Sequence, residues 1–188
     1  MNKLSFIPKL IILDRDGVIN KDYPTGCLSK KDFILLPRVI EALRLMNTCG
    51  VLTAIATNQA LVGRGDISQA TLDDIHHHMY EVFKAQNVIV GPLYYCTDTS
   101  IEPHFRRKPA PGMLIEAMND LKCSPHETVF IGDAQRDLEA AHNANCTPIL
   151  VKTGKGMNTM KNLNPHHKNI LVYDDLYDAV KHIFYEIF

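Results

Sequence analysis

The sequence lacks both a long apolar run and an excess of charge of one sign. No apolar run approaches the roughly 18 residues that a transmembrane helix needs, so we expect no membrane partner. The 20 lysine and arginine residues are matched by 21 aspartate and glutamate residues. This balance argues against a nucleic-acid partner, because nucleic-acid binders usually carry a clear excess of basic residues to neutralise phosphates. With 46% hydrophobic and 22% charged residues, the chain has the composition of an ordinary globular protein.

Cysteine pairs and targeting signals are also missing. The five cysteines are odd in number, scattered, and contain no Cys-x-x-Cys pair, which indicates reduced thiols and a cytoplasmic setting. The apolar stretch 4–13 is interrupted by Pro8 and Lys9 and lacks a small-residue cleavage site, so we expect no signal peptide. No repeat, low-complexity segment or linker divides the chain. We therefore predict a cytoplasmic protein with one domain over residues 1–188.

Short apolar runs alternate along the chain with segments of helical periodicity. The apolar runs predict strands at residues 10–13, 51–56, 92–96, 128–131, 148–151 and 170–173. Helical segments are predicted around residues 39–46, 68–83, 114–121 and 135–145 and at the C-terminus, with loops over 97–111 and 154–168. This order predicts an α/β fold with a three-layer, doubly wound and mainly parallel sheet.

Aspartates directly follow two of the predicted strands. Asp14 and Asp16 end the first strand in an Asp-x-Asp-Gly motif, and Asp133 follows strand 128–131 with Asp137 four residues later. Because ligands of open α/β sheets bind beyond the carboxyl ends of the strands, we expect these acids to converge on one crevice. Clustered carboxylate oxygens suit Mg²⁺. The alternative is that Asp-Gly only forms a turn after the strand. A turn does not explain why the second strand is also followed by aspartates, Asp133 and Asp137.

Neutral and basic hydrogen-bond donors follow at the same predicted edge of the sheet. Strand 51–56 is followed by Thr57-Asn58-Gln59, whose hydroxyl and amide groups can donate to phosphate oxygens, although a helix cap or an Asx turn is the alternative. The segment Arg106-Arg107-Lys108-Pro109 places three cations before a predicted helix N-terminus, where anions are favoured. A solvated basic loop is the alternative for that segment.

In this order, the motifs resemble those of the haloacid dehalogenase-like phosphatases, and within them the branch of heptose-bisphosphate and histidinol-phosphate phosphatases. The resemblance covers residues 10 to 155. Its matching segments are Asp14 to Asn20, Thr57-Asn58-Gln59, Gly63-Arg64-Gly65, Arg107-Lys108-Pro109, Pro111-Gly112-Met113, Gly132 to Asp137 and Lys152 to Lys155. It implies a Rossmann-like core without a large cap domain, Mg²⁺ as cofactor, a small phosphorylated sugar as substrate, and a monomer.

The resemblance also implies a role for each candidate residue. Asp14 would be the nucleophile, Asp16 the general acid and base, and Thr57 and Lys108 would stabilise the transferring phosphoryl group. The implied metal ligands are Asp14, Asp16 through its backbone carbonyl, and Asp133, and Asp137 would orient Lys108 or a metal-bound water. The implied substrate-binding residues are Asp22, Tyr23, Pro24, Thr25, Asn58, Gln59 and Arg107.

The implied reaction is removal of the C7 phosphate of a heptose 1,7-bisphosphate through an aspartyl-phosphate. Alternatives are hydrolysis of histidinol phosphate or of another small phosphomonoester. A phosphatase that acts on the ends of nucleic acids would use the same chemistry. The balanced net charge, however, gives no indication of a basic surface that would bind the phosphates of a nucleic-acid backbone. A non-catalytic phosphosugar-binding module is a further alternative. Such a module would not need a nucleophile, a general acid, a cation and a metal ligand, but this chain has all four in Asp14, Asp16, Lys108 and Asp133.

The chain departs from this branch at a zinc loop that many members carry before the Arg-Lys-Pro segment. The corresponding positions read Cys96-Thr97-Asp98 and His104-Phe105-Arg106, and an arginine cannot ligate zinc. We therefore predict no structural zinc, with a weak three-ligand site at Cys96, Asp98 and His104 as the alternative. Ala60 and Ala134 replace polar residues that are common in heptose phosphatases.

The run His76-His77-His78 is expected to lie on a solvated helix face, because adjacent helical residues cannot all reach one ion.

Overall fold

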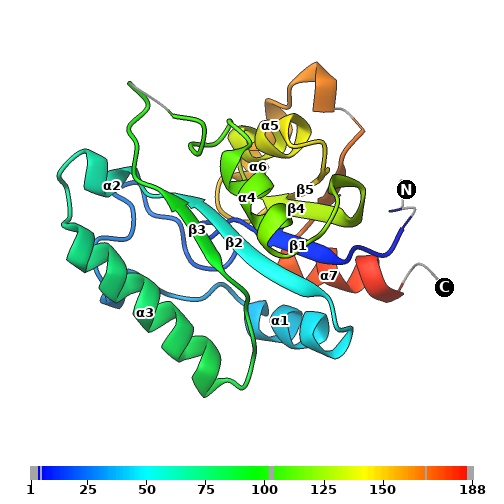
Figure 1. Ribbon diagram of the computed structural model, residues 1–188, viewed down its shortest axis with the longest axis horizontal. Coiled ribbons are helices and arrows are strands. Elements are labelled where there is room, and N and C mark those ends of the chain that lie inside the picture. Colours follow the sequence, from blue (N-terminus) through cyan, green and yellow to red (C-terminus); the bar gives the residue numbers. More distant parts are fainter. Residues whose placement is uncertain (1–3, 5, 102–103, 168, 186–188) are drawn as a thin grey trace.

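Six strands form one sheet in which every hydrogen-bonded pair is parallel. The computed structural model describes residue 4 and residues 6–101, 104–167 and 169–185. The strand order is β3-β2-β1-β4-β5-β6. The strands are β1 (Leu10–Leu13), β2 (Leu52–Asn58), β3 (Leu93–Cys96), β4 (Thr128–Gly132), β5 (Thr147–Val151) and β6 (Leu171–Tyr173) (Figure 1). The predicted α/β fold with a doubly wound sheet is confirmed, and the sheet is parallel throughout.

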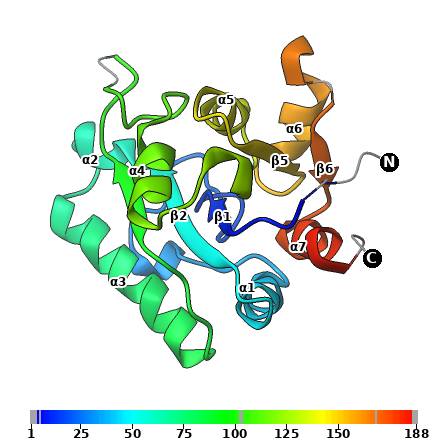
Figure 2. The same cartoon turned by 45° about the vertical axis from the view of Figure 1, so that its right-hand side comes forward.

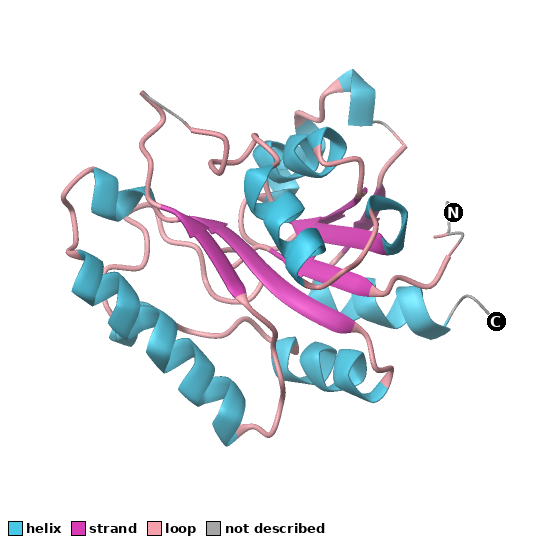
Figure 3. Cartoon of the chain, in the orientation of Figure 1, coloured by secondary structure: helices cyan, strands magenta, loops and turns pink. Residues whose placement is uncertain are grey.

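Helices supply the crossovers that parallel strands require (Figure 3). They are α1 (Val39–Thr48), α2 (Ala60–Gly63), α3 (Gln69–Ala85), α4 (Gly112–Asp120), α5 (Gln135–Asn143), α6 (Gly156–Lys161) and α7 (Leu176–Tyr185). Three short 3-10 helices span Lys30–Asp32, Pro125–Glu127 and Pro165–His167. Helix α3 begins after Ser68, whose hydroxyl accepts a hydrogen bond from the Thr71 backbone N–H at 3.1 Å. No helix of the described residues has the length and apolar character that crossing a membrane demands.

The two faces of the sheet are covered by different helices, which makes the three layers. Ile11 and Leu13 of β1 pack into a core with α1, α3 and α7, whereas Leu10 and Ile12 pack into a second core with α4 and α5. This separation follows from the alternation of side chains along a strand. Figure 2 shows α4 and α5 on the opposite side of the strands from α1 and α7. The described residues add no large cap domain to this core.

The predicted elements depart from the structure mainly in three places, one of which is the unpredicted short helix α2. Strand β2 runs on to Asn58, so Thr57 and Asn58 belong to the strand and do not follow it. The loop predicted over 154–168 contains α6 and a 3-10 helix, and its last residue, Lys168, lies outside the described residues. Helix α6 has only six residues, too few to show a period, and a tertiary contact anchors it: the Thr159 hydroxyl donates to the Asp133 carbonyl at 2.8 Å.

The prediction of a solvated face at the three adjacent histidines is wrong for His76. This side chain is 7% exposed, and its ring packs against Tyr95 with the centroids 5.1 Å apart. His76 lies four residues after Leu72 and therefore falls on the buried stripe of α3. His77 is exposed, as expected.

Candidate active site

The candidate site lies where the strand order changes direction. Strand β1 has β2 on one side and β4 on the other, so the carboxyl end of β1 is the switch point at which open α/β sheets bind ligands. Asp14 follows β1, and Asp133 follows β4. The Asp14 backbone N–H donates to the Ile131 carbonyl at 2.9 Å, which continues the pairing of the two strands past their ends. The convergence of these two aspartates, expected from the sequence, is thus present.

Lys108 is buried between two carboxylates of the site. Its Nζ lies 2.9 Å from Asp14 Oδ1 and 2.8 Å from Asp137 Oδ1, and it donates to the Ala56 carbonyl at 2.8 Å. Burial alone would lower the pKa of Lys108, but the carboxylates of Asp137 and Asp14 outweigh burial and raise it. Lys108 is therefore a permanent cation beside the candidate nucleophile.

Asn58 holds the backbone of Lys108 in place. Its Nδ2 donates to the Lys108 carbonyl at 2.9 Å, and its Oδ1 accepts from the Lys108 N–H at 3.1 Å. Both ends of this amide, which the sequence assigned to substrate binding, are therefore engaged in positioning the buried cation. Asn58 nevertheless also lines the pocket described below.

Three buried carboxylates form a candidate metal centre. Ligand oxygens of Asp14, Asp133 and Asp137 lie within 4.8 Å of one another. One oxygen of Asp133 accepts from the Lys155 N–H at 2.7 Å, whereas its Oδ1 is buried without a hydrogen-bond partner among the described residues. An orphaned buried carboxylate oxygen, beside two further carboxylates, fits a hard divalent cation such as Mg²⁺.

The pKa values of these acids also indicate that a nearby positive charge would stabilise their ionised forms. Burial, with the carboxylates of Asp137 and Asp14, raises the pKa of Asp133 to about 8. Burial also raises the pKa of Asp14 to about 6, although Lys108 acts in the opposite direction. Burial opposes ionisation of Asp137, but the charges of Lys108 and Arg136 and its hydrogen bonds together lower its pKa. Asp137 also accepts from the Ala134 N–H at 3.0 Å, so it is tied to both Lys108 and the start of α5.

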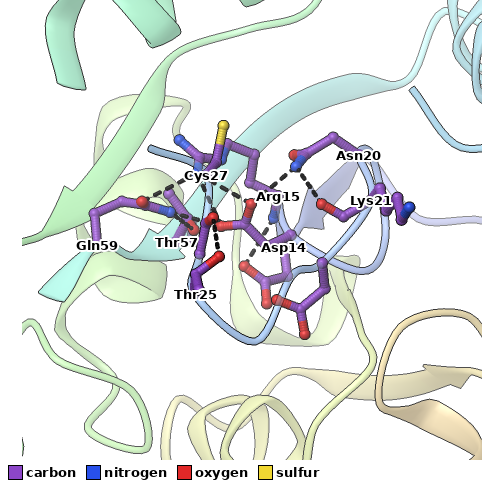
Figure 4. A network of polar contacts seen from close by, with 12 residues as sticks. Asp14, Arg15, Asn20, Lys21, Thr25, Cys27, Thr57 and Gln59 are labelled. Atoms are coloured by element: carbon purple, nitrogen blue, oxygen red, sulfur yellow. Dashed lines mark hydrogen bonds and ion pairs between the residues drawn. The ribbon is translucent and has the colours of Figure 1, made fainter. Parts of the chain in front are cut away.

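A separate network joins residues of the loop after β1, among them Arg15 and Asn20, to Thr57 and Gln59 at the end of β2 (Figure 4). Asp16 belongs to this network. It accepts hydrogen bonds from Arg15 Nη2 at 2.9 Å, Asn20 Nδ2 at 2.9 Å and Gln59 Nε2 at 2.7 Å. Gln59 Nε2 also donates to Thr57 Oγ1 at 2.9 Å. Burial opposes ionisation of Asp16, but Arg15 and the hydrogen bonds lower its pKa. Asp16 is therefore held as a carboxylate.

A pocket beside this network gathers the residues that the sequence assigned to substrate binding. Its wall includes all seven of them together with Asp16: Asp22, Tyr23, Pro24, Thr25, Asn58, Gln59 and Arg107. Residues 22–25 lie in the loop after β1, while Arg107 precedes α4. Thr57, by contrast, is buried, and its hydroxyl faces Gln59 rather than forming part of this wall.

Sequence reasoning missed two arginines of the site. Arg15 is fully buried and orders Asp16, although it was only an intermediate residue of the Asp-x-Asp motif. Arg136 lines the pocket from the first turn of α5. A signal for Arg136 was present, because a basic residue inside the Gly-Asp-x-x-x-Asp segment must lie near the switch point.

The positions of the family zinc loop are used for other contacts. His104 Nδ1 lies 3.0 Å from Asp98 Oδ2, which also accepts from the His104 N–H at 3.1 Å. Arg106 pairs with Glu116 at 3.0 Å. The residues between, 102–103, lie outside the described part of the chain. That no structural zinc binds here stays a prediction.

The chain is similar to heptose-bisphosphate phosphatases. A HAD-hydrolase-like family model matches residues 105–179. The D-glycero-beta-D-manno-heptose-1,7-bisphosphate 7-phosphatase of Pseudomonas aeruginosa is 38% identical over 89% of this chain and 93% of its own length. The corresponding protein of Neisseria meningitidis serogroup A is 33% identical over 95% and 96%. The crystal structure of D,D-heptose 1.7-bisphosphate phosphatase from B. bronchiseptica, complexed with magnesium and phosphate, is 32% identical and has a TM-score of 0.89 over 95% of this chain and 99% of its own.

Fold, site and likeness together define a phosphatase of the haloacid dehalogenase-like class. Sequence identity above 30% over nearly the whole length narrows this class further. The chain belongs to the family of the heptose-bisphosphate phosphatases. The resemblance inferred from the motifs, and the conclusion that the protein is an enzyme of this kind, are confirmed.

Proposed function

We propose that this protein is a Mg²⁺-dependent phosphomonoesterase that removes the C7 phosphate of D-glycero-D-manno-heptose 1,7-bisphosphate. The observation that carries the proposal is the buried cation Lys108, 2.9 Å from Asp14, beside an acidic cluster that fits a divalent metal. The names of the relatives supply the substrate. In this reaction a carboxylate nucleophile has to approach a phosphate dianion, and such an approach needs positive charge on both sides of the reacting phosphorus.

The proposed chemistry has two displacements at phosphorus. An oxygen of Asp14 attacks, the bond from phosphorus to the C7 oxygen breaks, and Asp16 gives a proton to the departing alcohol. Asp16 then takes a proton from a water molecule, which attacks the aspartyl-phosphate and releases inorganic phosphate and the Asp14 carboxylate. Thr57 and Lys108 are proposed to stabilise the phosphoryl group during both displacements.

Asp16 has to take up a proton before it can act as the acid. In the structure, Arg15 keeps it ionised, with its pKa lowered. A phosphate dianion that enters the pocket raises the pKa of a neighbouring carboxyl group. Substrate binding therefore supplies the electrostatic change that lets Asp16 accept the proton.

Mg²⁺ is proposed to bind to Asp14, Asp133 and the backbone carbonyl of Asp16. When bound, it offsets the negative charge of the carboxylates and of the phosphate oxygens. The orphaned Oδ1 of Asp133 supports this assignment, as does the magnesium in the related crystal structure. Asp137 is proposed to hold Lys108 in place, since the two side chains lie 2.8 Å apart.

A substrate panel tests the proposed specificity. Protein stripped of metal and returned to Mg²⁺ is offered D-glycero-D-manno-heptose 1,7-bisphosphate and histidinol phosphate, and released phosphate is measured. We expect a higher kcat/KM for the heptose bisphosphate. The reverse ranking would reject the substrate assignment, and release from neither compound would reject the proposed function.

Replacing the candidate nucleophile tests the mechanism. Asp14→Asn is expected to lower kcat by at least about 1,000-fold, because the aspartyl-phosphate can no longer form. The exposed Asp74, which pairs with Lys30 at the surface, offers a matched control as Asp74→Asn. The control is expected to keep the wild-type rate. Turnover by Asp14→Asn within about 100-fold of wild type would contradict the mechanism.

A further inference from the structure

Basic side chains from four separate parts of the chain line the substrate pocket. They are Arg64, Arg107, Arg136 and Lys155, whereas the acidic side chains of the same wall are Asp16 and Asp22. The pocket therefore carries a local excess of positive charge in a protein of nearly zero net charge. An anion larger than a single phosphate can be accommodated by cations spread in this way.

Two of these four cations already have carboxylate partners. Arg64 Nε lies 2.7 Å from Asp66 Oδ2, and Lys155 Nζ lies 2.7 Å from Asp22 Oδ2. Among the described residues, neither Arg107 nor Arg136 has a carboxylate within 4.0 Å. The two remaining guanidinium groups are thus the cations of the pocket whose charge is not balanced by a direct ion pair.

Arg136 is poised to bind an anion. Its Nε is buried and has no hydrogen-bond partner among the described residues. Arg107 donates from Nη1 to the Asp98 carbonyl at 2.6 Å, which fixes one edge of its guanidinium. Burial lowers the pKa of Arg107, and the charge of Arg136 lowers it further, so the two guanidinium groups repel each other. An anion between them would relieve this repulsion and offer a partner to the unpaired donor.

The candidate nucleophile and its buried cation are not part of this wall. Asp14 and Lys108 contact each other and are buried, and neither belongs to the wall of the pocket. Arg107 and Arg136 lie in the wall itself. Arg107 and Arg136 thus form a second group of cations in the pocket wall, although the charge of Arg136 also acts on Asp14 and Asp137.

We propose that Arg136 binds, together with Arg107, the second phosphate of a bisphosphorylated substrate, and that Arg136 determines the preference for bisphosphates over monophosphates. This inference rests on the proposed phosphatase function. A planar guanidinium can donate two parallel hydrogen bonds to a phosphate, which a lysine ammonium cannot reproduce. The preference is therefore expected to depend on the shape of the Arg136 side chain as well as on its charge.

The test compares two substrates that differ only in the second phosphate. D-glycero-D-manno-heptose 1,7-bisphosphate and D-glycero-D-manno-heptose 7-phosphate carry the same scissile C7 ester, and KM and kcat are measured for both. Arg136→Gln is expected to raise KM for the bisphosphate about ten-fold or more and to leave KM for the 7-phosphate within about two-fold of wild type. Arg136→Lys is expected to give an intermediate KM for the bisphosphate.

Arg106→Gln is the matched control. Arg106 lies one residue before Arg107, pairs with Glu116 and is absent from the wall of the pocket, and its replacement changes the net charge equally. It is expected to leave both KM values unchanged. An equal rise of both KM values in Arg136→Gln would overturn the inference, because Arg136 would then only balance the buried carboxylates. No rise of either KM would also overturn it, because Arg136 would then have no role in substrate binding.

The outcomes separate this inference from the proposed function. If the wild-type protein hydrolyses both compounds and the ratio of their KM values is the same in all variants, only the role of Arg136 fails. If the wild-type protein hydrolyses neither compound, the proposed function fails and the inference fails with it. Should Arg136→Gln melt at a temperature well below wild type, Arg136→Lys carries the same comparison. An unchanged ratio of the KM for the bisphosphate to the KM for the 7-phosphate would overturn the inference, and a raised ratio would support it.

Discussion

At the scale of single residues, the site depends on a few charged groups that are completely buried. Lys108 and Asp137 have no exposed side-chain surface, and Asp14 has almost none. Removing one member of a buried ion pair usually costs more than the pair itself contributes, because the remaining charge stays desolvated. The cation of this site is therefore also a determinant of stability.

Replacing Lys108 tests this dual role. In metal-free buffer, Lys108→Met is expected to lower the free energy of unfolding by about 3 kcal/mol, because Asp14 and Asp137 lose their counter-charge. Lys152 pairs with Asp174 at the surface, and the matched Lys152→Met variant is expected to cost at most about 1 kcal/mol. Urea unfolding of both variants measures the difference. Equal losses in the two variants would contradict the argument.

His76 gives the protein an acid-sensitive position outside the metal centre. Burial lowers its pKa to about 4, and the positive charge of Arg15 acts in the same direction, against Asp73 and Asp16. The unfolded chain binds a proton near pH 6.5, so the native state loses stability as the pH falls from about 6.5 towards 4. Stability contributed by the neutral imidazole is fully present above this range.

A leucine at this position should remove that part of the pH dependence. Between pH 7 and 4, wild type is expected to lose up to about 3 kcal/mol through His76, and His76→Leu is expected to lose correspondingly less. His77→Leu, at an exposed neighbouring position, should keep the wild-type slope. The free energy of unfolding is measured by urea titration at several pH values. Parallel curves for wild type and His76→Leu would refute the assignment.

At the scale of elements, the turn after β1 is shaped to admit a carboxylate from the end of β4. Gly17 has φ +88°, and a Cβ built on it would lie 2.1 Å from Asp133 Oδ2. A side chain at this position would be strained by the backbone and would also collide with the candidate metal ligand. The glycine of the Asp-x-Asp-Gly motif is therefore required for more than a turn.

An alanine at Gly17 separates these two effects when it is compared with another glycine of positive φ. Gly50 has φ +67°, but nothing lies within 4 Å of the Cβ that would be added. Gly50→Ala is expected to cost about 1 kcal/mol of stability and to keep full activity. Gly17→Ala is expected to lose at least about 100-fold in kcat/KM, since Asp133 has to move. Similar activity in the two variants would show that Asp133 tolerates the displacement.

At the scale of the whole molecule, near-neutral charge conceals two opposed clusters at one end of the sheet. Acids that follow β1 and β4 or lie in α5 form one cluster, and bases from four loops and helix ends line the pocket. Burial, together with the mutual repulsion of the acids, raises the pKa of Asp133 and Asp14. A bound divalent ion should therefore stabilise the entire fold.

Thermal unfolding with and without Mg²⁺ measures this coupling without any assay of activity. At a Mg²⁺ concentration about 100 times Kd, the wild-type protein is expected to gain about 2.7 kcal/mol and a higher Tm. Asp133→Asn removes the orphaned carboxylate oxygen, so its Tm is expected to be insensitive to Mg²⁺. Asp74→Asn serves again as the control and should respond as wild type does. An equal rise of Tm in Asp133→Asn would place the ion elsewhere.

The sequence by itself determined the order of the strands along the chain, the class of the fold and the acids at the strand ends. Apolar periodicity reports which face of an element is buried, and this is a local property that neighbouring residues decide. The same reasoning located Asp14 and Asp133, because the carboxyl ends of parallel strands meet at one edge. The resemblance carried by the ordered motifs also named seven residues that line one pocket in the structure.

Only the tertiary structure decided the partners of these groups. Local pattern cannot show that Asn58 holds Lys108, that Gln59 donates to Asp16 or that His76 is buried against Tyr95, because each contact joins segments distant in sequence. The short helix α6 was missed for the same reason, since its stability comes from contact with the loop after β4 and not from its own six residues. The proposed role of Arg136 depends on four cations, distant in sequence, that meet in one wall, and their shared charge is a property of the folded molecule.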